Sequence, residues 1–141
     1  MTTMRERFID QLMATLSDEP RLRDAGVVVE RSLFAAFANS EPRVLVVHRS
    51  SDPVVEENIG VTTRECGVAL SAVVRGDAPD READVVFEVT HPLVMRFQAD
   101  GLIGVREAGT DEPQAGDADG GVGVVTMRYL FLYQTRAGHL D

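Results

Sequence analysis

The stretch TTRECGVALSAVVRGDAPDREADVVFEVTHPLVMRFQ (residues 62–98) predicts a strand, a tight turn and a helix. Up to Arg75 the side chains alternate between two faces, which is the period-two pattern of an extended strand. Residues 76–80 (GDAPD) then end the strand and begin a helix, because proline is tolerated in a first helical turn. The residues expected on the core side of that helix are Ala83, Val86, Phe87, Thr90, Leu93, Val94 and Phe97. This unit indicates an α+β domain.

The remaining elements follow from similar patterns. We expect Pro92 to bend or break the helix near His91, because its ring fixes φ and removes a backbone donor. A strand that is apolar on both faces usually lies centrally, and RVLVVHR (residues 43–49) is of this kind. Besides these, we expect a helix at residues 4–17, strands at 27–33, 102–105 and 122–135, and either a helical turn or a packed loop at 34–38. The predicted fold class is α+β, a single domain over residues 1–141. Its one antiparallel or mixed sheet has about four to five strands, with two main helices packed on one face.

Two acidic connections are longer than the strands they join require. Residues 50–61 carry apolar side chains with no obvious core to join, and residues 107–121 combine acidic residues with four glycines. Each is either a mobile loop or an arm that becomes ordered against a partner. The candidate partner-docking residues are Asp52, Val54, Val55, Glu56, Glu57 and Ile59 in the first, and Asp111, Glu112, Asp117 and Asp119 in the second. The DADG sequence at 117–120 lacks the closing glutamate of a calcium loop, which favours a solvated loop.

The last strand carries apolar residues on both faces. One face is formed by Val125, Met127, Tyr129, Phe131 and Tyr133. The other face contains Leu130 and Leu132, where a half-buried strand of a monomer would be polar. Either helices or another subunit must cover this second face. Because only two good helices are visible, we favour a subunit interface at Leu130 and Leu132.

Composition limits the classes of partner. The chain has 141 residues and a net charge of −9, and its 14 lysine-or-arginine positions are all arginine. A negative balance argues against direct DNA binding, which needs a basic face. No apolar run reaches the roughly 18 residues of a membrane span. The N-terminal residues lack the pattern of a signal peptide, so we expect a cytoplasmic protein without membrane or sequence-specific nucleic-acid contacts.

The sequence contains no recognisable catalytic motif. GxSxG, HExxH, a P-loop and a GxGxxG opening a helix are all absent. The single cysteine, Cys66, shares a strand face with Val68 and Leu70, and we interpret it as a small buried hydrophobe. We therefore expect neither enzymatic activity nor a cofactor or metal site.

Six segments, taken in order, resemble those of one protein family. They are MRERFIDQLMATL (4–16), RVLVVHR (43–49), RECGVALSAVVRGDAP (64–79), READVVFEVTHPLVM (81–95), GDADGG (116–121) and VGVVTMRYLFLYQTR (122–136). Over nearly the whole chain this layout is similar to that of the tail terminator proteins of long-tailed phages, the minor tail protein U type. The resemblance lies in the order and spacing of the segments, none of which is catalytic.

The resemblance implies a structural protein that forms a six-membered ring of identical chains. Such a ring would cap the tail tube, stop its polymerisation and offer a surface for head-tail joining. The implied partners are further copies of the chain, the tail tube protein and the head-tail connector protein, met in the host cytoplasm during assembly and then in the virion tail. A closed ring needs heterologous contacts. For these we expect an apolar contact at Leu130 and Leu132, with Arg64, Arg75 and Arg128 pairing carboxylates at its rim.

Two alternatives belong to other classes. A small-ligand-binding or regulatory α+β domain would be dimeric and would have a pocket between sheet and helices. An enzyme using Cys66 or His91 would have a thiol that reacts readily with alkylating reagents.

Overall fold

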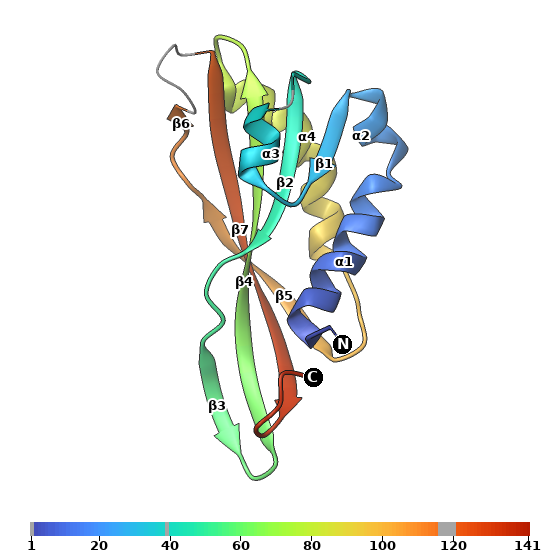
Figure 1. Cartoon of the computed structure of the whole chain (residues 1–141), viewed down its shortest axis with the longest axis vertical. Coiled ribbons are helices and arrows are strands. Elements are labelled where there is room, and N and C mark those ends of the chain that lie inside the picture. Colours follow the sequence, from blue (N-terminus) through green and yellow to red (C-terminus); the bar gives the residue numbers. More distant parts are fainter. Residues whose placement is uncertain (1, 39, 116–120) are drawn as a thin grey trace.

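The computed structural model describes residues 2–38, 40–115 and 121–141, and it shows one mixed sheet with helices on both faces (Figure 1). Neighbouring strands follow the order β1-β2-β4-β7-β5, while β3 pairs with β4 and β6 pairs with β7. The elements are α1 (Met4–Ser17), α2 (Pro20–Asp24), β1 (Val27–Glu30), α3 (Leu33–Ala38), β2 (Arg43–Arg49), β3 (Val54–Asn58), β4 (Val61–Arg75), α4 (Pro79–Met95), β5 (Leu102–Thr110), β6 (Gln114–Ala115) and β7 (Val122–Arg136).

The two longest strands, β4 and β7, form the axis of the molecule (Figure 1). Each has 15 residues, and they pair antiparallel along their full length, from Val61 opposite Arg136 to Arg75 opposite Val122. β1 joins the edge of β2 in parallel, while the other strand pairs are antiparallel. The α+β class and the mixed sheet are confirmed, but the sheet has seven strands among the described residues rather than four or five.

One sheet face is covered by α1 and α4, the two main helices expected from the sequence (Figure 1). Thr3 caps α1 by accepting a hydrogen bond from the backbone N–H of Glu6. Phe131 of β7 packs between the aromatic rings of Phe8 and Phe97. The distance between ring centroids is 6.4 Å to Phe8 and 5.7 Å to Phe97. The buried core includes Phe8, Ile9, Leu12, Leu16, Leu45, Val47, Cys66, Leu70, Val86, Phe87, Tyr129, Phe131 and Tyr133. The alternation and the helical spacing of residues 62–98 are therefore confirmed.

The expectation that helices lie on one face only is wrong. α3 lies over the opposite face, where Ala36 packs with Val44, Val46, Val73 and Val122. These residues point away from α1 and α4 because strand side chains alternate. The predicted strand at 27–33 is shorter than expected and ends at Glu30, because residues 33–38 form this short helix and bury Ala36.

The break expected near His91 does not occur, since α4 continues through Pro92 to Met95. Pro92 lies in the last turn, so little helix remains to lose hydrogen bonds, and its carbonyl still accepts from the N–H of Arg96 at 3.2 Å. Among the described residues, no helix is both long and apolar enough to cross a membrane.

The two acidic connections contain more strand than expected. Residues 54–58 form β3 and pair with β4, because their backbone groups find partners along its free edge. Residues 107–110 belong to β5, and Gln114–Ala115 forms β6. Asp117 and Asp119, proposed from the sequence for docking, lie outside the described residues.

Candidate functional site

The hairpin of β3 and the first part of β4, residues 54–64, extends beyond the helices at one end of the molecule (Figure 1); we call it the arm. All five residues of β3 are exposed, and Val54 and Val55 keep about half of their surface in contact with solvent (46% and 52%). Ile59 is fully exposed beside Gly60, which makes the turn with a φ of 80°. The arm therefore presents apolar side chains where an isolated chain gains nothing from them.

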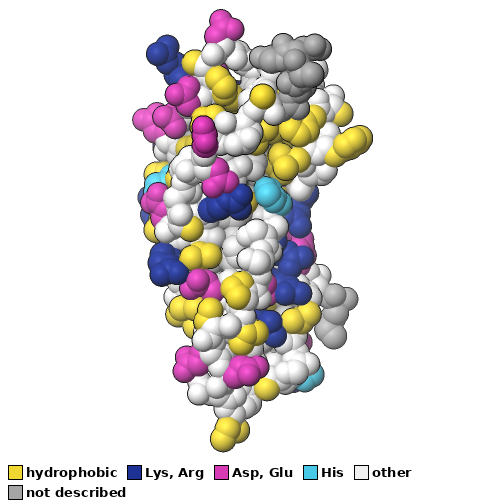
Figure 2. Space-filling model, turned by 90° about the vertical axis from the view of Figure 1, so that its left-hand side faces the viewer, with side chains coloured by type: hydrophobic (Ala, Val, Ile, Leu, Met, Phe, Trp, Pro, Cys, Tyr) yellow, Lys and Arg dark blue, Asp and Glu magenta, His cyan; other side chains and the backbone are white. Residues whose placement is uncertain are grey.

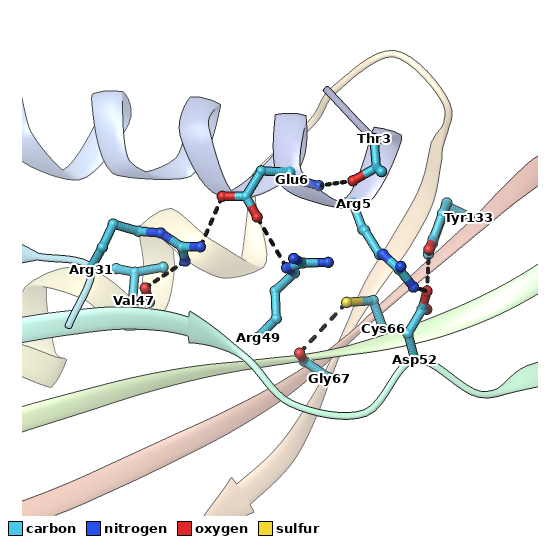
Figure 3. Close-up of polar contacts among 10 residues, drawn as sticks. All are labelled: Thr3, Arg5, Glu6, Arg31, Val47, Arg49, Asp52, Cys66, Gly67 and Tyr133. Atoms are coloured by element: carbon cyan, nitrogen blue, oxygen red, sulfur yellow. Dashed lines mark hydrogen bonds and ion pairs between the residues drawn. The ribbon is translucent and has the colours of Figure 1, made fainter. Parts of the chain in front are cut away.

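The base of the arm is fixed by Asp52 (Figure 3). Its carboxylate pairs with Arg5 of α1 at 2.7 Å and accepts a hydrogen bond from the Tyr133 hydroxyl at 2.6 Å. The Asp52 side chain is only 8% exposed, so this docking candidate anchors the arm rather than facing a partner. Burial, with the Asp52 carboxylate adjacent, raises the pKa of Tyr133, and the hydrogen bond to Asp52 raises the pKa of Arg5.

A second ion cluster holds the start of α1 against the sheet (Figure 3). Glu6 pairs with Arg31 at 2.8 Å and with Arg49 at 3.1 Å. Arg31 also donates to the carbonyl of Val47 at 2.9 Å. Together, Glu6 and Asp52 connect α1 to both ends of the segment that leads from β2 into the arm.

Among the described residues, α3 is the only helix on the sheet face opposite α1 and α4, and it lies at one end; we call the part of this face beyond α3 the open face. Leu130 and Leu132 point to this face and are half-buried, while Phe131 between them is buried in the core. A hollow of about 240 Å³ lies here between β7 and β5, lined by Glu65, Gly104, Val105, Arg106, Leu130 and Leu132. Apolar and charged side chains are interleaved on the side of the molecule shown in Figure 2.

Charged pairs border the two leucines. Arg106 reaches Glu65 at 3.2 Å and keeps 69% of its side chain exposed. Arg128 forms a two-pronged pair with Asp111, with nitrogen–oxygen distances of 2.7–3.0 Å. The hydrogen bonds from Arg128 lower the pKa of Asp111.

The three arginines expected at the rim lie in different places. Arg128 is on the open face beside the leucines. Arg64 points to the opposite sheet face, on the arm, and donates to the Thr135 hydroxyl at 3.2 Å. Arg75 lies at the far end of β4 and donates to the carbonyl of Phe37 at 3.3 Å. Of the remaining docking candidates, Glu56, Glu57 and Glu112 are exposed.

Sequence reasoning missed Arg5, Tyr133 and Arg106 as parts of these surfaces. Arg5 and Asp52 are 47 positions apart, so no local pattern connects them. Arg106 pairs with Glu65 only because β5 and β4 both flank β7. A sheet topology was needed before these pairs could be recognised.

The groups considered for catalysis have structural partners. Cys66 is buried, and burial raises the pKa of its thiol to about 11, which disfavours a nucleophilic thiolate. His91 contacts the Tyr129 hydroxyl at 2.7 Å and Glu107 at 3.3 Å, which connects α4 with β7 and β5. Within the described parts of the chain, no group of three or more histidine, cysteine, aspartate or glutamate side chains could hold a metal ion.

The ligand-binding alternative expects a pocket between sheet and helices. That interface is occupied by the core side chains of α1, α4, β4 and β7. At the edge of this core a hollow of about 430 Å³ lies between α4 and the sheet, lined by Asp84, Phe87, Glu88, His91, Thr110 and Met127. Another hollow, of about 530 Å³, lies beside the connection of α4 to β5, at residues 95–105.

Comparison with known proteins gives a relationship at the level of the fold. No protein-family model and no curated protein matches the chain. A solved structure does. The similar chain comes from the virion of a native gene transfer agent (GTA) particle, with a TM-score of 0.61 and 11% sequence identity. The match covers 90% of this chain and 92% of the GTA virion chain, so the two share a fold over nearly their whole lengths.

Proposed function

We propose that this chain is a structural protein of a phage or phage-like particle, and that it forms a ring capping the tail tube. The observation that carries this proposal is the fold shared with a chain of a GTA virion, which covers 90% of one chain and 92% of the other. The order of the sequence segments resembles tail terminators independently of that fold.

The surfaces of the chain support assembly as its role. The open face places Leu130 and Leu132 in a shallow hollow, and the arm carries Val54, Val55 and Ile59 into solvent. Apolar side chains in two exposed places are typical of a chain that contacts other chains. They lie on different parts of the molecule, which suits the heterologous contacts of a closed ring.

The proposed mechanism is geometric. Subunits form a ring, six in the arrangement implied by the family resemblance, and one side of the ring binds the last layer of tail tube protein. The other side does not match a further tube subunit, so polymerisation stops, and it binds the head-tail connector instead. Assembly takes place in the host cytoplasm, and the ring stays in the virion tail.

The experiment is to polymerise the tail tube protein of the same particle with and without this chain and to image the tubes by negative-stain electron microscopy. We expect shorter tubes with extra ring-shaped density at one end. The matched control is the Leu130→Glu/Leu132→Glu variant, which keeps the helix-covered core intact. Tubes of unchanged length without end density would overturn the proposal.

A further inference from the structure

The arm and the hollow at Leu130 and Leu132 (hereafter the hollow) are successive parts of one sheet. In the arm, β3 pairs with residues 61–64 of β4, which lie opposite residues 133–136 of β7, whereas the hollow lies further along β7, between residues 130–132 and residues 104–106 of β5. Because both belong to one hydrogen-bonded sheet, the arm cannot fold back onto the hollow of its own chain. Any contact between them must join two chains.

The arm and the hollow have complementary apolar surfaces. Val55 and Ile59 are exposed on the arm, while Leu130 and Leu132 provide an apolar surface in the hollow. Contact between the two would remove both from water, which is the main favourable term in protein association.

Their charges are complementary as well. Glu56 and Glu57 lie on β3, and the structure gives them no ion-pair partner among the described residues. Arg106 at the hollow contacts Glu65 through one nitrogen and remains 69% exposed. A guanidinium has five N–H donors, so Arg106 can donate to a second carboxylate without losing its hydrogen bond to the first.

The arm is held in place before any partner arrives. Asp52 ties its base to Arg5 and Tyr133. The backbone of Gly67 bonds to Ser50 and Ser51 at 2.9 and 2.8 Å, and Ser50 occupies the space that a Cβ at this glycine would need. A rigid arm loses less conformational entropy on binding than a flexible one.

We propose that the arm of one copy of this chain binds the hollow at Leu130 and Leu132 of the next copy. The contact is heterologous, since each chain offers its arm to one neighbour and its hollow to the other, and repetition gives a ring or a filament. The inference deepens the proposed capping ring and rests on it for closure. It also names a second copy of this chain as the partner of the docking residues predicted in the first acidic connection.

The test uses a Val55→Cys/Leu132→Cys variant of the full chain and a short bismaleimide crosslinker. Cys66 is buried and its thiol pKa is raised to about 11, so the crosslinker reacts with the two introduced thiols. We expect a ladder of covalent oligomers at multiples of the 15.4 kDa subunit on a denaturing gel.

Three controls define the result. A Val85→Cys/Leu132→Cys pair places one thiol on α4, away from the arm, and should remain monomeric. Each single-cysteine variant should also remain monomeric, whereas efficient dimers of Val55→Cys alone would indicate an arm-to-arm contact and overturn the proposal. Adding Leu130→Glu to the crosslinking pair should weaken the ladder by about tenfold or more. Circular dichroism and urea unfolding confirm that each variant is folded.

The outcome is separable from that of the capping experiment, because no tube protein is present. If the variant forms the ladder but the chain does not cap tubes, the contact between arm and hollow is supported and the capping function is rejected. If the chain caps tubes but the variant forms no ladder, the capping function is supported and the contact between arm and hollow is rejected.

Discussion

The two faces of β7 have different roles, although their residues alternate along one strand. Phe131 is completely buried among Phe8 and Phe97, whereas its neighbour Leu132 lies half-buried in an open hollow. The helix-covered face supplies the folding free energy, because its apolar area is removed from water within the chain. The open face leaves similar side chains for a partner. Apolar character alone therefore does not distinguish a core residue from an interface residue. On β7 the two are distinguished by whether a helix covers the face on which the residue lies.

The largest expected effect follows from truncating the two faces at matched positions. Phe131→Ala should lower the free energy of unfolding by about 3–5 kcal/mol, since it empties a fully enclosed site. Leu132→Ala should lower it by about 1 kcal/mol or less, because this side chain is only half-buried. Urea unfolding of both variants measures the difference. Equal losses would contradict the division between the two faces.

The arm should depend on its buried anchor. Asp52→Ala leaves the Arg5 guanidinium and the Tyr133 hydroxyl without their shared acceptor, at a cost of about 1–3 kcal/mol. Hydrogen exchange should rise in β3 while that of β7 near Phe131 stays slow. Asp52→Asn is the control, since its amide oxygen still accepts from Tyr133. Unchanged exchange in Asp52→Ala would show that the arm does not need this anchor.

The reactivity of two thiols in one chain compares the buried core with the exposed arm. At pH 8, Cys66 should react with iodoacetamide at least about 100-fold more slowly than a cysteine introduced at Val55. Burial raises the Cys66 pKa from 9.0 to about 11, whereas position 55 is half exposed. Mass spectrometry of the modified peptides gives both rates. Similar rates would place Cys66 outside the core.

The same thiol gives a pH dependence with a defined sign. Above its unfolded pKa of 9.0, the folded chain retains the Cys66 proton more tightly than the unfolded chain. The free energy of unfolding should therefore fall as the pH rises from 9 towards about 11. Cys66→Ala removes this contribution, so its slope over that range should be smaller. An identical slope in both proteins would contradict a raised thiol pKa.

The smallest effect is expected on the open face itself. Arg128→Ala should change the stability of the isolated chain by only about 0–1 kcal/mol, because its pair with Asp111 is exposed on both sides. Arg128 lowers the pKa of Asp111, so the contribution of the pair is present near neutral pH and disappears as the pH falls through the lowered pKa. Thermal unfolding at pH 7 and pH 3 measures it, with Asp111→Asn as the matched variant.

The fold was predictable where periodicity is long. The alternation over residues 62–75 and the helical spacing after Pro79 identify β4 and α4, because burial selects one face of each. β3 was missed because all of its side chains are exposed, so no burial pattern shows it. α3 was ambiguous because it is short and buries only Ala36.

The surfaces were predictable only in part. Leu130 and Leu132 stand out from sequence, because apolar residues on the second face of a strand need a cover. The Asp52 anchor and the Arg106–Glu65 pair depend on contacts between distant segments. The arginines expected around one rim are distributed over both faces and the far end of β4, since strand position alone does not place them.

The most direct test mixes two variants that are each defective on one surface. The Val55→Asp/Ile59→Asp variant replaces the apolar surface of the arm with charge. The Leu130→Glu/Leu132→Glu variant does the same to the apolar surface of the hollow. Light scattering after size exclusion should give the 15.4 kDa monomer mass for each variant alone and larger assemblies for the unmodified chain. An equal mixture should give twice the monomer mass, because one intact arm meets one intact hollow and growth stops there. A mixture that stays at the monomer mass would contradict assembly through the arm and the open face.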